Sequence, residues 1–164
     1  MHEHRLTDAL RELRTRDVRF VIVGGLAAVL NGAPVQTYDL DVVYSVDSEN
    51  IDRLLKFLEN SEAIFRIQPH RRLRPNQSHL TAGGHLNLLT RYGPLDLMGT
   101  IGQGMKYSDL LPHSIEMRIG EASTVRVLDL ETVIAVKEQL STEKDLAALP
   151  ILRRTLAEIR KKNR

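Results

Sequence analysis

The stretch that decides the fold spans residues 20–44 and reads FVIVGGLAAVLNGAPVQTYDLDVVY. It opens with residues 20–23, an apolar run rich in β-branched side chains, which predicts a buried strand. Gly24 and Gly25 break this run, and residues 26–30 predict a short apolar helix that ends at Asn31-Gly32. Residues 37–44 predict a second strand. The stretch therefore predicts two strands joined by a glycine turn and one short helix.

Two aspartates occupy alternate positions of the second predicted strand. Because side chains alternate across a strand, Asp39 and Asp41 share one face, while Leu40 and Val42 share the other. Aspartate is disfavoured in strands, and two carboxylates this close repel each other unless a cation lies between them. Their oxygen atoms suit Mg²⁺ or Mn²⁺. The pair predicts a divalent metal site, although a strand with one solvated face is the other interpretation.

The glycine pair suggests what such a metal would accompany. Gly24 and Gly25 have no side chains, so the backbone N–H groups of the turn and of the following helix can approach a phosphate closely. Mg²⁺ commonly completes its coordination shell with substrate phosphates. Taken alone, the pair is equally typical of a tight packing turn, and it lacks the third glycine of a dinucleotide-binding fingerprint. Together with the aspartates, it favours a site for a metal-bound triphosphate.

A third carboxylate belongs to a later predicted strand, over residues 95–98. Asp96 stands there between Leu95 and Leu97, in the same alternation of apolar and acidic side chains. We expect a neighbouring antiparallel strand to place Asp96 opposite the first two aspartates. Three carboxylates allow two metal ions about 3.5–4 Å apart, which stabilise the attacking and leaving oxygens of a phosphoryl displacement. Asp96 is then the candidate to orient or deprotonate an acceptor hydroxyl.

The rest of the chain predicts an α+β fold: a mixed, mostly antiparallel sheet with helices on one face, followed by a short helical C-terminal region. We expect a core over residues 1–128 and a helical region packed on it over residues 129–164, with a boundary that is also compatible with a single domain. Residues 66–84 show no regular periodicity. Further helices are predicted over residues 6–16, 49–60, 130–140 and 143–162, and further strands over 63–67, 86–89, 116–119 and 125–128.

Composition excludes several classes of protein. The 164 residues suffice for one full hydrophobic core, and the net charge of +2 is too small to indicate nucleic acid by itself. The absence of cysteine excludes a disulfide scaffold, a thiolate zinc site and a cysteine nucleophile. The longest apolar stretch, residues 20–30, is too short to span a bilayer, and no signal peptide precedes it. We therefore expect a cytoplasmic protein without a membrane partner.

The sequence resembles the polymerase-β-type nucleotidyltransferase superfamily, and above all the small prokaryotic nucleotidyltransferases of toxin–antitoxin and abortive-infection systems. The similarity covers about residues 18–150, and its diagnostic residues are the glycine pair and the three aspartates. The stretch 88–97 and the segment Val136-Lys137 to Lys144-Asp145-Leu146 are also similar. The resemblance implies that nucleotide is bound by Gly24, Gly25, Thr37 and Lys137, metal by Asp39 and Asp41, and metal or acceptor by Asp96.

This resemblance implies a metal-dependent enzyme that transfers an NMP from an NTP to a hydroxyl group and releases pyrophosphate, with Mg²⁺ or Mn²⁺ as cofactor. An RNA end such as that of tRNA, a partner protein and a small molecule are all compatible acceptors, and toxin–antitoxin relatives suggest the first two. The alternative is a catalytically weak nucleotide-binding module or antitoxin-like partner with the same fold. Gln36 motivates it, because it stands where many members carry a basic residue; a second departure is Gly25, where serine is frequent.

Two basic segments are candidates for RNA contacts. The run from Arg66 to Arg74 and the tail Arg160-Lys161-Lys162-Arg164 could meet phosphates, and the arginines of residues 71–74 could replace the missing cation. The first segment has no interleaved aromatic residues, which argues against base stacking, and a solvated loop is its ordinary interpretation. His85 lacks the spacing of a metal ligand, and we expect a structural role for it.

Overall fold

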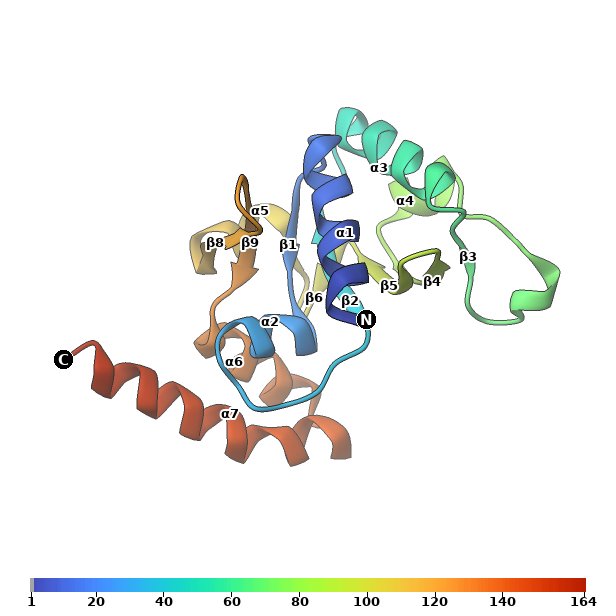
Figure 1. Ribbon diagram of the computed structural model, residues 1–164. Helices are drawn as coiled ribbons and strands as arrows, with labels where there is room; N and C mark the ends of the chain where they lie inside the picture. The colour runs from blue at the N-terminus through green and yellow to red at the C-terminus, as the bar shows by residue number, and fades with distance from the viewer. Residues whose placement is uncertain (1) are drawn as a thin grey trace.

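The computed structural model describes residues 2–164, with side chains from Arg5 onward. Figure 1 shows helices gathered around a twisted sheet, with the α6–α7 pair at one end and α3 and α4 at the other. The helices are α1 (His2–Thr15), α2 (Gly24–Leu30), α3 (Ser48–Asn60), α4 (Gln77–Ala82), α5 (Tyr107–Leu110), α6 (Leu130–Leu140) and α7 (Glu143–Lys162). None of these described helices is both long and apolar enough to cross a membrane.

Seven strands form the main sheet, in the order β3-β4-β5-β2-β1-β9-β8. β1 pairs in parallel with β9, and β2 in parallel with β5, whereas the other neighbouring strands are antiparallel. β6 and β7 form a separate antiparallel pair. The predicted α+β class with a mixed, mostly antiparallel sheet is confirmed. The strands are β1 (Phe20–Ile22), β2 (Leu40–Tyr44), β3 (Ile64–Phe65), β4 (His85–Thr90), β5 (Gly93–Met98), β6 (Thr100–Ile101), β7 (Met105–Lys106), β8 (Ser114–Ile119) and β9 (Ser123–Leu128).

The strand that carries the third aspartate runs in the direction opposite to the one expected. β5 is parallel to β2, with Asp41 paired to Asp96, so the prediction of an antiparallel neighbour was wrong. The reason lies between the two strands in sequence: the chain crosses over through α3 and then forms the β4–β5 hairpin. Because the strands of a hairpin are antiparallel, β5 returns in the direction of β2. The parallel register still brings the two aspartates side by side.

Two boundaries near the glycine pair also differ from the prediction. α2 begins at Gly24 rather than at residue 26, since Gly24 adopts φ +64 and lets the chain turn directly from β1 into the helix. β2 begins at Leu40 rather than at residue 37, so Asp39 precedes the strand. The hydroxyl of Thr37 donates a hydrogen bond to the carbonyl oxygen of Asp39 at 3.3 Å and holds this approach to the strand.

The segment 66–84, which showed no periodicity, contains a short 3-10 helix, Pro69–Arg71, and one α-helix, α4. α4 has only six residues, too few for a periodic pattern, and its start is fixed by a capping box. In that box the side chain of Asn76 accepts a hydrogen bond from the backbone N–H of His79, and the His79 ring accepts one from Asn76. The preceding part of the segment, from β3 to Asn76, projects as an open loop at the end of the molecule near α3 (Figure 1).

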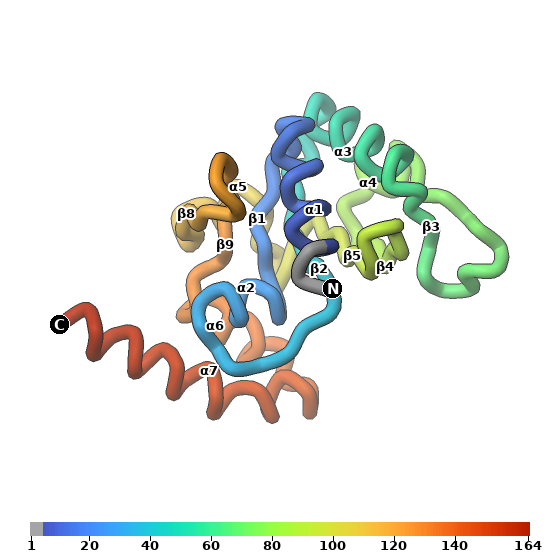
Figure 2. The backbone as a smooth tube through the Cα atoms, in the orientation of Figure 1, coloured from blue at the N-terminus to red at the C-terminus, as the bar shows by residue number. Residues whose placement is uncertain are grey.

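The helices cover the central strands of the sheet and leave a cavity beside it. α1 packs on β8 and β9, and α2 packs on β2, β9 and α6. α3 buries one apolar stripe, which includes Ile51, Leu54 and Leu58. α7 packs along α6, and Figure 2 shows the other end of α7 extending away from the sheet toward the C-terminus. Leu149 and Leu152 of α7 are buried, so this helix closes one side of the space between α2 and α6.

Candidate active site

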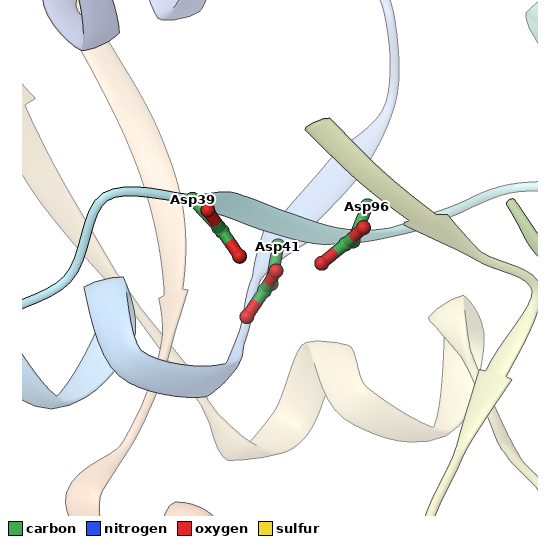
Figure 3. A group of neighbouring side chains, drawn as sticks. All are labelled: Asp39, Asp41 and Asp96. Carbon is green, nitrogen blue, oxygen red and sulfur yellow. The ribbon is translucent and has the colours of Figure 1, made fainter. Parts of the chain in front are cut away.

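Three carboxylates converge where the start of β2 lies beside the middle of β5 (Figure 3). Asp39 precedes β2, Asp41 lies in β2, and Asp96 lies in β5. Each offers an oxygen atom, and these atoms all lie within 4.8 Å of one another. Asp96 is buried, whereas Asp39 and Asp41 are half-buried. The structure thus brings together the three acidic residues that the sequence singled out.

Their proximity perturbs the central carboxyl group. The pKa of Asp41 is raised from 3.8 to about 7. The largest cause is burial, followed by a hydrogen bond with Asp96 and the negative charges of Asp96 and Asp39. The positive charge of Arg66 acts in the opposite direction. The mutual repulsion of the three carboxylates therefore opposes ionisation of Asp41, and a cation placed among them would relieve it.

The donor set fits a small divalent cation. The Oδ1 atom of Asp41 is buried and has no hydrogen-bond partner among the described residues, which is costly for a group that ionises. All the candidate ligand atoms are carboxylate oxygens, which suit Mg²⁺ or Mn²⁺ rather than the softer transition metals. Asp39, Asp41 and Asp96 are hence the residues that could hold such an ion.

The glycine pair lies directly against this cluster. The backbone N–H of Val23 donates to the carbonyl oxygen of Asp41 at 2.9 Å, which fixes the start of α2 beside β2. A Cβ atom on Gly24 would lie 2.3 Å from Oδ2 of Asp41, and one on Gly25 would lie 3.0 Å from Oγ1 of Thr37. Any side chain at Gly24 would therefore collide with the carboxylate, so the site requires glycine there.

A cavity of about 660 Å³ opens from the carboxylates toward α6 and α7. Its polar wall includes every residue predicted to bind nucleotide and two of the three aspartates, Asp39 and Asp41, whereas Asp96 does not line it. Its apolar wall includes side chains of α6 and α7. Lys137 and Lys144 bring positive charge to the same cavity, which Gln36 also lines. The glycine and polar residues that line it are Gly24, Gly25, Gln36, Thr37, Tyr38, Asp39, Asp41, His85, Thr100, Gly102, Lys137, Thr142, Lys144 and Asp145.

Lys137 reaches the cavity as half of an ion pair. Its Nζ lies 3.2 Å from Oδ1 of Asp145, which joins α6 to the first turn of α7, and both side chains are largely buried. Burial opposes ionisation of Asp145, but hydrogen bonds from Thr142 and Lys137 outweigh it and lower the pKa of this carboxyl group. The ammonium group of Lys137 is thereby oriented on the cavity wall.

Two residues at the site were missed or misjudged from the sequence. Arg66 was grouped with a basic loop, yet its Nη2 donates to Oδ1 of Asp96 at 2.8 Å. His85 was expected to be structural, yet it lines the cavity with its Nε2 4.0 Å from the same oxygen. No spacing pattern links either residue to Asp96, because the contacts arise from strand pairing. Arg71, Arg72 and Arg74 do not line the cavity, so Lys137 and Lys144 are the cations there.

Comparison with solved structures shows proteins of similar fold. No family model matches the sequence, and no curated protein matches it. Among solved structures, the lincosamide antibiotic adenylyltransferase LnuA with bound lincomycin aligns with a TM-score of 0.61 and 14% identity, over 92% of this chain and 96% of that one. TM1012 of Thermotoga maritima, a proposed nucleotidyltransferase, aligns with a TM-score of 0.53 and 18% identity, over 93% and 91% of the two chains. The chain thus has the fold of these nucleotidyltransferases.

Proposed function

We propose that this protein is a metal-dependent nucleotidyltransferase that transfers an NMP from an NTP to a hydroxyl group. The observation that carries the proposal is the convergence of Asp39, Asp41 and Asp96, within 4.8 Å of one another, beside a helix start that must be glycine. Fold likeness alone would not support an activity, because one fold hosts many functions. Here the fold, the carboxylates and a cavity of about 660 Å³ coincide at one place.

The residues of the polar wall have distinct proposed roles. Asp39 and Asp41, together with Asp96, would hold Mg²⁺ or Mn²⁺, and the ion when bound would offset the negative charge of the phosphates. Gly24 and Gly25 would allow the triphosphate to approach the backbone closely, since no side chain stands in the way. Thr37 and Lys137 line the same wall, where a hydroxyl and an ammonium group can donate to phosphate oxygens.

The chemical step follows from these positions. The acceptor oxygen attacks the α-phosphorus, the bond from that phosphorus to the oxygen bridging it to the β-phosphorus breaks, and pyrophosphate leaves. Asp96 does not itself line the cavity, but its carboxylate oxygen lies within 4.8 Å of those of Asp39 and Asp41, which do. We propose that an acceptor hydroxyl placed against this cluster gives its proton to Asp96 as general base. Asp96 is held by Arg66 at 2.8 Å, so the base has a fixed orientation.

The double variant Asp39→Ala/Asp41→Ala tests the proposal. Wild-type protein incubated with each α-³²P-labelled NTP, Mg²⁺ and a cell lysate should place label on an acceptor. The double variant should transfer no label and lose metal-dependent NTP binding in calorimetry, while circular dichroism shows an intact fold. Removal of the metal with EDTA should have the same effect on the wild type. Label transfer by the folded double variant would refute the assignment.

The same incubation identifies the acceptor class. Label in RNA, in protein or in small molecules distinguishes a tRNA or other RNA end, a partner protein and a small hydroxyl compound. LnuA is a lincosamide adenylyltransferase with lincomycin bound, which favours including small hydroxyl compounds in the assay. A toxin–antitoxin role, suggested by the sequence resemblance, stays a prediction that the identity of the labelled acceptor will test.

A second candidate function is a nucleotide-binding module with little catalytic activity. It is favoured by Gln36, which lines the cavity where many relatives have a basic residue. The cations Lys137 and Lys144 stand on the same cavity wall and favour the enzyme instead. Calorimetric binding of NTP with Mg²⁺, but no label transfer to any lysate component, would support the module.

A further inference from the structure

Arg66 is connected to the carboxylate cluster through a fixed set of contacts. Its backbone N–H donates to the carbonyl oxygen of Asn87 at 2.9 Å, which ties the chain after β3 to β4. Its guanidinium group then crosses β4: Nη1 donates to the carbonyl oxygen of Leu88 at 3.3 Å, and Nη2 donates to Oδ1 of Asp96 at 2.8 Å. Two nitrogens of one planar group therefore bind two acceptors on neighbouring strands, β4 and β5.

The charge of Arg66 is important because its neighbourhood is strongly acidic. Among the basic side chains that the structure describes, only those of Arg66 and His85 come within 4.0 Å of a carboxylate oxygen of the cluster. The side chain of Asp96 is only 12% exposed, so solvent contributes little to the stability of its negative charge. Arg66 itself does not line the cavity and would not touch a substrate there. Its influence on the reaction would pass through Asp96.

We propose that Arg66 is a positioning residue of the active site, which engages one oxygen of Asp96 and holds this carboxylate in a fixed orientation beside Asp41 and Asp39. This inference rests on the proposed nucleotidyltransferase function. It separates Arg66 from Arg71, Arg72 and Arg74, which are exposed and lie in the projecting loop. Arginine is suited to the task because its planar fork reaches the carbonyl of Leu88 and Asp96 together, whereas a lysine ammonium is a point charge.

The test compares Arg66→Gln, Arg66→Lys and the matched control Arg53→Gln in the full chain. Arg53 on α3 has a side-chain exposure of 38%, close to the 33% of Arg66, and its ion pair with Glu49 is remote from the cavity. We expect Arg66→Gln to lower kcat for NMP transfer about 10- to 100-fold, as loss of a partner that orients a catalytic ligand does. The KM for NTP should stay within about twofold, because Arg66 does not line the cavity.

The lysine variant and metal binding make the test independent of simple misfolding. Arg66→Lys should restore kcat partly, since it keeps the charge and loses the two-acceptor geometry. Mn²⁺ affinity, measured by electron paramagnetic resonance, should weaken about 10-fold in Arg66→Gln and stay unchanged in Arg53→Gln. The inference would be overturned if either Arg66 variant kept the wild-type kcat. It would also be overturned if the whole loss of kcat/KM came from a higher KM.

The outcomes separate this inference from the proposed function. If the wild type transfers no label, the proposed function fails, and Mn²⁺ affinity then decides the inference: an unchanged or tighter affinity in Arg66→Gln overturns it. If the wild type is active and only the Asp39→Ala/Asp41→Ala variant is impaired, the function stands and Arg66 has no positioning role. If Arg66→Gln fails to fold, Arg66→Lys is expected to give an intermediate kcat, and full wild-type activity would contradict the proposal.

Discussion

Gly24 shows how a single residue couples backbone conformation to the candidate site. Its φ of +64 lies in the left-handed region, and its missing Cβ leaves room for Oδ2 of Asp41. Gly32 is the natural comparison, because it also has a positive φ of +98, yet a Cβ there would meet nothing within 4 Å. A side chain at Gly32 would therefore cause backbone strain alone, whereas one at Gly24 would cause the same strain and a collision with the carboxylate of Asp41.

We therefore predict different outcomes for Gly24→Ala and Gly32→Ala. Both should lower the free energy of unfolding by about 1–2 kcal/mol, because alanine disfavours the left-handed region. Only Gly24→Ala should also displace Asp41 and abolish metal-dependent NTP binding. Urea unfolding and calorimetry measure the two effects, and normal NTP binding by Gly24→Ala would contradict the packing argument.

Asp41 gives a prediction for the metal-free protein as a function of pH. Its pKa is about 7 in the folded chain and near 3.8 in the unfolded chain, so the folded state binds this proton more tightly. The stabilising contribution of the protonated group is complete below about pH 3.8 and is lost as pH rises to about 7. In wild-type protein with EDTA, Asp41 should therefore reduce stability most at pH 8.

The variant Asp41→Asn removes this titration. Its free energy of unfolding in EDTA should exceed that of the wild type, and the excess should grow by about 1 kcal/mol per pH unit between pH 5 and pH 7. Exposed Asp52→Asn, which also removes one carboxylate, should change stability by less than about 0.5 kcal/mol at either pH. Urea titrations at pH 5 and pH 8 measure these differences, and an equal excess at both would reject the perturbed pKa.

The contacts of single residues also show how much of the site could be predicted from the sequence. Asp39, Asp41 and Asp96 were predicted to meet, because alternation in strands and their chemistry are visible in the sequence itself. The contact of Arg66 with Asp96 was not, because it spans 30 positions and depends on the order of three strands. A basic run is the only signal there, and it cannot show which arginine turns inward.

At the scale of helices and strands, the main error of the prediction was the direction of β5, and this error had little effect on the predicted site. Alternating side chains determine which face Asp96 occupies, and this property is the same in parallel and antiparallel strands. Strand direction depends on the crossover through α3 and the β4–β5 hairpin, which no local pattern encodes. The six-residue α4 was missed because its evidence is a cap at Asn76, not a periodic stripe.

The projecting loop before α4 gives a prediction at this scale. Between Glu62 and Asp96 the sequence contains no acidic residue, so the arginines of this loop lack nearby partners of opposite charge in sequence. Arg71, Arg72 and Arg74 are exposed, and none of them forms an ion pair in the structure, which describes this whole segment. Such unpaired cations are suited to contacts with the phosphates of an RNA acceptor.

The triple variant Arg71→Gln/Arg72→Gln/Arg74→Gln should weaken RNA binding at low salt. Loss of three phosphate contacts on a single strand should also flatten the slope of log affinity against log salt concentration by about 2. Fluorescence anisotropy with a labelled single-stranded RNA, titrated at several salt concentrations, measures both. Unchanged affinity and slope would reject an RNA-binding role for the loop.

At the scale of the whole molecule, the sheet forms one wall of the cavity and the C-terminal helices form another. The carboxylates come from β2 and β5 with the residue before β2, whereas the opposite wall comes from α6 and α7. Three ion pairs join these two helices: Lys137 with Asp145 on the cavity wall, and two exposed pairs, Glu138 with Arg153 at 2.8 Å and Glu131 with Arg160 at 3.4 Å. The pairs offer a way to separate helix attachment from nucleotide binding.

Lys137→Met and Glu138→Gln each break one connection between α6 and α7. Lys137→Met should weaken NTP binding about 10-fold, equivalent to about 1.4 kcal/mol, because it removes a charge-assisted donor from the cavity. Glu138→Gln breaks a solvent-exposed pair, which contributes less than about 1 kcal/mol to stability, and should leave NTP affinity unchanged. Calorimetric titration with NTP and Mg²⁺ compares them. Equal losses of affinity would mean that helix attachment alone matters, whereas the expected difference would assign Lys137 to the nucleotide.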